Sequence, residues 1–157
     1  MSLDCLTYST TSAGLPFLLL PKEHLKHSSP KRVSLTLNPT HLPSEYRRGS
    51  NGTAFITNKR LVYIAEKHPD NDFQDFVLLF NANLHDFKME TPWFGANKFT
   101  VLFKPTMENA GLNHMYIWKG IFSFNEGGIA DFSTQVGKAY NEWKYGQDGE
   151  QLPAYHE

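Results

Sequence analysis

The chain has few of the features that mark a secreted or membrane-spanning protein. Cys5 is the one cysteine among 157 residues, so an intramolecular disulfide is impossible and a disulfide-stapled secreted mini-domain is excluded. The longest apolar run, residues 15–20, is interrupted by Pro16 and is too short to span a bilayer. No Lys or Arg precedes this run, so it is not expected to be a signal peptide. We therefore expect an intracellular soluble protein in the cytoplasm, with access to the nucleus left open.

The chain also has no large excess of charge of either sign. Its 15 Lys and Arg residues nearly balance its 16 Asp and Glu residues, which gives a net charge of −1. Proteins that bind nucleic acids are usually distinctly basic, because they neutralise phosphates. We therefore predict no direct contact with nucleic acid.

Motifs of common enzymes are missing as well. The sequence contains no P-loop, no G-x-G-x-x-G and no G-x-S-x-G. His24 and His27 have a spacing that a metal could use, but no third and fourth ligand is evident beside them. Cys5 could act as a nucleophile only if a base were held against it, which is difficult in an arm predicted to be flexible. We predict no enzymatic activity, no metal and no cofactor.

Aromatic residues are abundant, at 14% of the chain, and many of them fall in strand-like segments. Val33, Leu35 and Leu37, for example, alternate with polar residues, as in a half-buried strand. Asn58 and Lys59 have the length of a tight turn between two such segments. The pattern predicts about seven strands, at 33–37, 53–57, 61–65, 73–80, 84–89, 99–103 and 115–124.

The apolar pattern changes its period near the end of the chain. Residues at helical spacing form one apolar stripe, namely Ile129, Phe132, Val136, Ala139, Tyr140 and Trp143. Two glycines precede the stripe, and Gly146 is predicted to end the helix. We therefore predict a mainly β domain at 15–145, a β-barrel or sandwich capped by this helix. A flexible arm at 1–14 and a short disordered tail at 146–157 are predicted to flank it.

Basic residues stand near the two ends of the first clear hairpin. They are Arg47, Arg48, Lys59 and Arg60. If they converge in space, they would form a patch for anionic lipid headgroups. If they do not, they are ordinary solvated charges at strand ends, and the sequence leaves both possibilities open.

The tail carries the tetrapeptide Leu152-Pro153-Ala154-Tyr155 close to the C-terminus. Pro153 fixes its own φ and pushes Leu152 toward an extended conformation, which biases the segment to polyproline II. That helix has three residues per turn, so Leu152 and Tyr155 project along the same edge. WW domains read short Pro-Tyr ligands in this way. We predict that Leu152, Pro153 and Tyr155 bind a WW domain.

Several segments resemble one known family. The segment GTAFITNKRLVY at 52–63 resembles the signature hairpin of GRAM domains, which have a pleckstrin-homology-like (PH-like) fold. Three further segments resemble the WW-domain-binding protein 2 group within that class, namely LPSEY at 42–46, WFGAN at 93–97 and FSFNEGGIADF at 122–132. The resemblance covers roughly residues 15–145 and implies a seven-stranded barrel plugged by a C-terminal helix.

The same resemblance implies a function. Members of the group are non-enzymatic adaptors whose PPxY-type motifs bind WW domains of transcriptional regulators and of Nedd4-type ubiquitin ligases. This chain departs from the group because it has one Leu-Pro-x-Tyr in place of a long tail with several motifs, which weakens the implied transcription coactivator role. The resemblance therefore favours an adaptor or substrate of a Nedd4-type ligase. The alternative is a module that binds phosphoinositide or a membrane surface through the basic hairpin residues.

Overall fold

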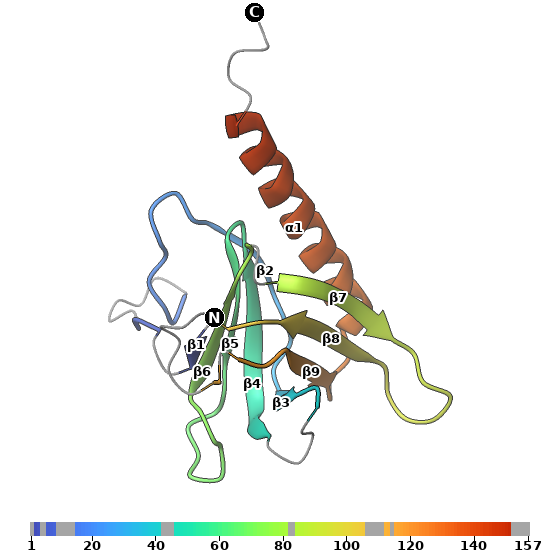
Figure 1. The fold of residues 1–157 in the computed structure, drawn as a ribbon. Helices are drawn as coiled ribbons and strands as arrows, with labels where there is room; N and C mark the ends of the chain where they lie inside the picture. The colour runs from blue at the N-terminus through green and yellow to red at the C-terminus, as the bar shows by residue number, and fades with distance from the viewer. Residues whose placement is uncertain are drawn as a thin grey trace, which may run out of the picture.

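The structure is a computed structural model that describes residues 2–3, 6–8, 15–41, 46–81, 84–105, 112–113 and 115–151, and for residues 2 and 147–151 the backbone alone. Within these residues the chain forms nine strands followed by one helix (Figure 1). The elements are β1 (Ser2–Leu3), β2 (Leu25–Ser28), β3 (Val33–Pro39), β4 (Arg47–Thr57), β5 (Arg60–Ile64), β6 (Asp75–Leu79), β7 (Leu84–Glu90), β8 (Lys98–Phe103), β9 (Trp118–Phe124) and α1 (Ile129–Gln151).

The strands form one antiparallel sheet in the order β1-β6-β5-β4-β3-β9-β8-β7, with β2 paired to β4. The long strand β4 belongs to both halves of this sheet. Its first part pairs with β3, from Arg47 to Gly52, and its second part pairs with β5, from Thr53 to Ile56. The sheet folds back on itself, because β6 touches β8 across the interior through the rings of Phe76 and Phe103, whose centres are 5.4 Å apart.

The alternation in the sequence places apolar side chains in this interior. Val33, Leu35 and Leu37 of β3 are fully buried, and the polar residues between them are partly exposed. In β5, Tyr63 is also fully buried, and its hydroxyl donates a hydrogen bond of 2.7 Å to the carbonyl oxygen of Val33. The hydroxyl of a buried tyrosine needs such a partner, because an unpaired polar group in the core is costly. A mainly β core is thus confirmed.

Gly52 of β4 lies where the chain packs most closely against β5. A Cβ atom at this position would lie 2.3 Å from the carbonyl oxygen of Ile64 and 2.7 Å from the hydroxyl of Tyr63. Both distances are far inside van der Waals contact, and one of the atoms belongs to the backbone. Any side chain at Gly52 would therefore push β4 away from β5.

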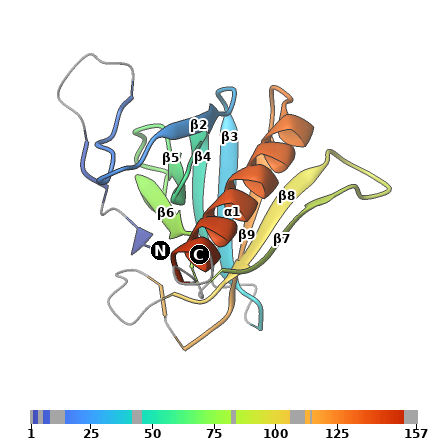
Figure 2. The same cartoon turned by 90° about the horizontal axis from the view of Figure 1, so that it is seen from above.

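Helix α1 closes one end of the folded sheet (Figure 2). Phe132 is fully buried, and its ring centre lies 5.1 Å from that of Phe124 and 5.4 Å from that of Phe99. One and two turns further on, Val136 and Ala139 are each 2% exposed. The predicted helical stripe is therefore confirmed as the buried face of α1. Among the described residues, no helix combines the length and the apolar character needed to cross a membrane.

Two predicted boundaries are wrong, namely the end of the helix and the extent of the N-terminal arm. Gly146 does not end the helix, since α1 continues to Gln151 and Gly146 lacks a positive φ. Each of the two glycines here, Gly146 and Gly149, costs a helix only about 1 kcal/mol, and the neighbouring Lys, Gln and Glu residues are good helix formers. Residues 146–151 of the predicted disordered tail are therefore helical.

The predicted flexible arm also contains structure. Ser2 and Leu3 form β1 and pair with Val77 and Phe76 of β6, while Leu3 and Leu6 are buried. The backbone amide of Leu6 also donates a hydrogen bond of 3.3 Å to Asp75. These partners lie about 70 residues away in the chain, so local composition did not reveal them. The unpredicted strand β2 likewise forms through pairing with β4.

The closure of the sheet by α1 leads to a stability prediction. Phe132→Ala should lower the free energy of unfolding by about 3–5 kcal/mol, because it leaves a cavity among aromatic rings that cannot collapse fully. Tyr145→Ala, on an exposed part of the same helix, should change it by less than about 0.5 kcal/mol. Urea unfolding of both variants checks this, and equal midpoints for the two would contradict it.

Candidate functional site

The end of α1 leads away from the sheet. The ring of Trp143 lies 6.5 Å from that of Phe80 next to β6, whereas the next three residues are exposed, with Tyr145 at 73%. From Trp143 the helix runs on to Gln151, which is about 12 Å of helix at its usual rise per residue. Figure 1 shows these last turns extending past the strands.

The predicted WW-binding residues Leu152, Pro153 and Tyr155 lie outside the described residues. They follow the last residue of α1 directly in the sequence. Their attachment point is therefore the far end of a helix that has already left the sheet.

The structure does not bring the four predicted basic residues together. Arg47 and Arg48 begin β4, whereas Lys59 lies in the predicted turn after its last residue and Arg60 begins β5. Strand β4 has 11 residues, and its part from Arg48 to Thr57 separates the two pairs by about 30 Å of extended backbone. Phosphoinositide binding by one patch that contains all four residues therefore lacks its geometric basis.

Arg60 is also turned inward, with an exposure of 6%. Its Nε and Nη2 atoms donate hydrogen bonds to both carboxylate oxygens of Glu23, at 2.8 and 3.1 Å. Nη2 also donates to the carbonyl oxygen of Leu18 at 3.1 Å, and the guanidinium carbon lies 5.4 Å from the centre of the Phe17 ring. Arg60 thus attaches the segment before β2 to β5 and is covered by it.

Glu23 is the matched partner of Arg60, and its carboxylate is buried. Besides Arg60, the hydroxyl of Thr57 and the backbone amide of Leu20 donate to it, at 2.6 and 2.7 Å. Burial alone raises the pKa of Glu23, but the hydrogen bonds from Arg60, Leu20 and Thr57 outweigh burial and hold the pKa below its usual value. The pair is charged at neutral pH and structural in role.

Lys59 does lie among basic residues, but not among the predicted ones. It borders a recess of about 760 Å³ together with Lys22, His24 and Lys26 from the segment before and within β2. Two of these ammonium groups already have partners: Lys59 donates to the carbonyl oxygen of Pro21 at 2.5 Å, and Lys26 is 2.6 Å from Glu142 of α1. Sequence reasoning missed this cluster, because nothing local indicates that residues 22–26 pack beside the turn at Lys59.

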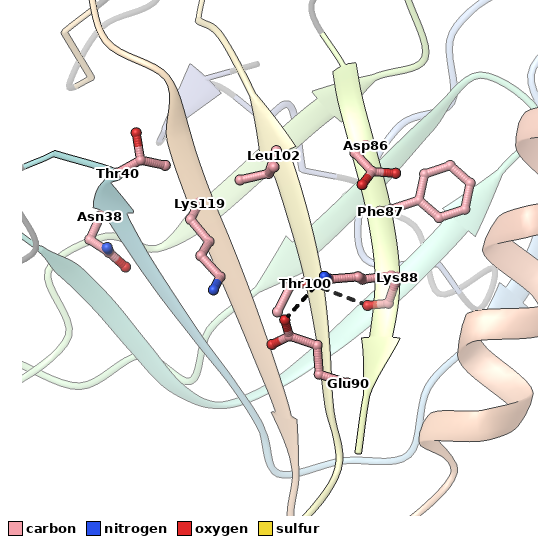
Figure 3. Close-up of a pocket in the computed structure, with 9 residues that line it drawn as sticks. All are labelled: Asn38, Thr40, Asp86, Phe87, Lys88, Glu90, Thr100, Leu102 and Lys119. Atoms are coloured by element: carbon pink, nitrogen blue, oxygen red, sulfur yellow. Dashed lines mark hydrogen bonds and ion pairs between the residues drawn. The ribbon is translucent and has the colours of Figure 1, made fainter. Parts of the chain in front are cut away.

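A second recess, of about 390 Å³, lies on the outer face of the sheet across β3, β9, β8 and β7 (Figure 3). Lys88 and Glu90 form an ion pair of 3.6 Å there, and Thr100 donates to the carbonyl oxygen of Lys88 at 3.4 Å. The recess is lined by Asn38, Thr40, Asp86, Phe87, Lys88, Glu90, Thr100, Leu102 and Lys119. Its mixed charges favour neither a cation nor an anion. In the part of the chain that the structure describes, no group of three or more His, Cys, Asp or Glu residues is placed to hold a metal.

Comparison with known structures defines the class of fold. The chain is similar to the Vps36 N-terminal PH domain, with a TM-score of 0.56 and 19% identity over 86% of this chain and 91% of that one. At this level of identity the likeness concerns the fold alone. A PH-like fold is therefore confirmed.

Comparison of sequences defines the family. No family model matches the chain. It is 37% identical over 133 residues to the UPF0664 stress-induced protein C29B12.11c of Schizosaccharomyces pombe, an alignment that covers 84% of this chain and 72% of the relative. The chain therefore belongs to the UPF0664 family. Neither comparison names a GRAM domain or WW-domain-binding protein 2, so that finer assignment stays a prediction.

The buried ion pair leads to a second stability prediction. Arg60→Ala should lower the free energy of unfolding by about 3–5 kcal/mol, because it leaves the Glu23 carboxylate buried without its charged partner. Lys59→Ala, at the neighbouring and partly exposed position, should cost about 1 kcal/mol or less. Removing both charges, in Glu23→Gln with Arg60→Met, should recover part of the loss. Equal effects of Arg60→Ala and Lys59→Ala in urea unfolding would contradict the structural role of Arg60.

The same pair predicts a dependence of stability on pH. The folded-state pKa of Glu23 lies below the 4.5 of a free carboxyl, so the carboxylate contributes stability that is fully present above pH 4.5. This contribution is lost as pH falls through the folded-state pKa. The stability difference between wild type and Arg60→Ala should therefore narrow below pH 4.5. Urea unfolding at pH 3 to 7 measures it, and a difference independent of pH would contradict the charged pair.

Proposed function

We propose that the protein is a non-enzymatic adaptor, or a substrate, that binds WW domains through Leu152, Pro153 and Tyr155. The observation that supports this proposal is the course of α1. The helix leaves the sheet after Trp143 and carries the chain outward to Gln151, one residue before the motif begins. A partner that binds the motif therefore meets the chain at the end of a helix that has already left the sheet.

The chemistry of the motif defines the partner class. Pro153 pre-extends the backbone, so a WW domain that binds it loses little chain entropy on association. Leu152 and Pro153 would fill an aromatic groove and the ring of Tyr155 a second pocket. Few side chains are anchored, so we expect micromolar affinity, with tighter association only through a second contact.

The partner we favour is a Nedd4-type ubiquitin ligase, acting in the cytoplasm. The proposal rests on the resemblance of residues 15–145 to the GRAM-containing WW-domain-binding protein 2 group, and on Leu-Pro-x-Tyr as a variant that Nedd4-type WW domains accept. A transcription coactivator role has less support, because the chain has one such motif.

The PH-like body is consistent with a module that binds proteins or lipids. The phosphoinositide alternative at Arg47, Arg48, Lys59 and Arg60 has less support than the tail. Arg60 forms a buried ion pair with Glu23. Of the other three residues, Arg47 and Arg48 lie at the start of β4, whereas Lys59 follows its end. Binding of WW domains by the tail is therefore the function we propose first.

Calorimetric titration of the intact protein into an isolated Nedd4-type WW domain tests the proposal. We expect micromolar binding that is lost in Tyr155→Ala, because the second pocket would then be empty. Tyr145→Ala is the matched control, since this exposed tyrosine lies ten residues earlier and outside the motif.

Two results would contradict the binding of WW domains by the tail. One is the same heat of binding for Tyr155→Ala and the wild type. The other is no binding by the intact protein together with no binding by a peptide of residues 147–157. Binding by the peptide alone would mean that the folded body hides the motif.

A further inference from the structure

Two aromatic side chains in the loop between β7 and β8 are almost fully exposed to solvent. Trp93 is 96% exposed and Phe94 is 88% exposed, the highest values among the large apolar residues that the structure describes. The other two tryptophans pack against the core: Trp118 is 3% exposed, and Trp143 is partly buried. Adjacent exposed aromatic rings are unusual on a protein surface and mark a site of interaction.

The scaffold under these rings is a hairpin whose register shifts once, between Leu84 and Asp86, far from the loop. Strands β7 and β8 pair from Leu84 opposite Phe103 to Glu90 opposite Lys98, directly at the base of the loop. Pro92 restricts the backbone before the two rings, and Gly95 follows them with a φ of 87°. Figures 1 and 2 both show this loop extending outward from the rest of the sheet. The rings therefore occupy a projecting, convex tip.

Charged residues surround the base of this tip. Lys88, Glu90 and Lys98 border a recess of about 640 Å³ beside Phe94. Glu90 is already matched by Lys88, at 3.6 Å, so the three side chains together leave one positive charge. The tip thus combines an apolar end with a net positive charge where the loop joins the strands.

We propose that this tip inserts into the surface of an anionic phospholipid membrane. Trp93 and Phe94 enter the boundary between headgroups and acyl chains, where indole rings are favoured. Lys88 and Lys98 stay at the level of the lipid phosphates. This site is distinct from the tail that binds WW domains in our proposal, and it uses none of Arg47, Arg48, Lys59 and Arg60.

The shape of the tip favours a membrane over a protein partner. A protein that buried both rings would need a pocket matched to a narrow convex loop, whereas a fluid bilayer adapts to it. The net positive charge at the base complements anionic headgroups. Two rings and one net charge give weak, reversible attachment, so binding is expected to weaken with salt.

Cosedimentation of the full chain with lipid vesicles tests the proposal. We expect binding to phosphatidylcholine vesicles that contain about a third phosphatidylserine, and weaker binding to phosphatidylcholine alone. Trp93→Ala with Phe94→Ala should reduce binding by at least about tenfold, because the apolar contact is gone. Tyr145→Ala removes an exposed ring elsewhere and should bind like the wild type. All variants should melt like the wild type, since none of these rings belongs to the core.

Tryptophan fluorescence gives an independent readout. Vesicles should shift the emission of the wild type to shorter wavelength, because Trp93 moves from water into lipid. Trp93→Phe keeps an apolar ring at the tip, so it should bind the vesicles but show no such shift.

Three results with vesicles would overturn the proposal. They are no binding of the wild type to anionic vesicles, full binding by the double alanine variant, and a shift that persists in Trp93→Phe. A dimer of the wild type in gel filtration that becomes a monomer in the double variant would also overturn it, and would assign the tip to contact between two copies of this chain.

Discussion

The contact of Phe132 with the aromatic rings inside the sheet is the constraint on which the rest of the structure depends. A sheet that bends at β4 and folds back on itself leaves one end open, and that end is lined by rings such as Phe99, Phe122 and Phe124. Helix α1 covers the opening because one side of it presents Phe132, Val136 and Ala139. Burial of large apolar surface of this kind is the main favourable term in folding.

The buried pair of Glu23 and Arg60 performs a different task, because it fixes how the chain enters the sheet. The carboxylate gathers hydrogen bonds from β5, from Thr57 of β4 and from the backbone of Leu20. A charge pair with this many partners specifies one position for the segment before β2. The same bonds remove Arg60 from the surface, so a basic residue in a hairpin is here part of the architecture.

Two parts of the described chain extend from the folded body, and our proposals assign a partner to each. At one, α1 passes beyond Trp143 and carries the chain toward the Leu-Pro-x-Tyr motif. At the other, β7 and β8 hold Trp93 and Phe94 away from the core. Membership in the UPF0664 family and a PH-like fold describe the scaffold that carries both features. In our proposals, one scaffold thus presents a protein ligand and a membrane contact on separate elements.

The sequence by itself determined the alternation of Val33, Leu35 and Leu37, the helical stripe through Phe132 and the composition of the tail, because these depend on residues a few positions apart. It did not reveal β1 or β2, whose backbone groups pair with β6 and β4 far along the chain. It also did not separate Arg60 from Arg47 and Arg48. Only the tertiary structure decided which of these charges meets a buried carboxylate and which lies at a strand end, because the availability of a charge depends on partners that folding brings from 37 residues away.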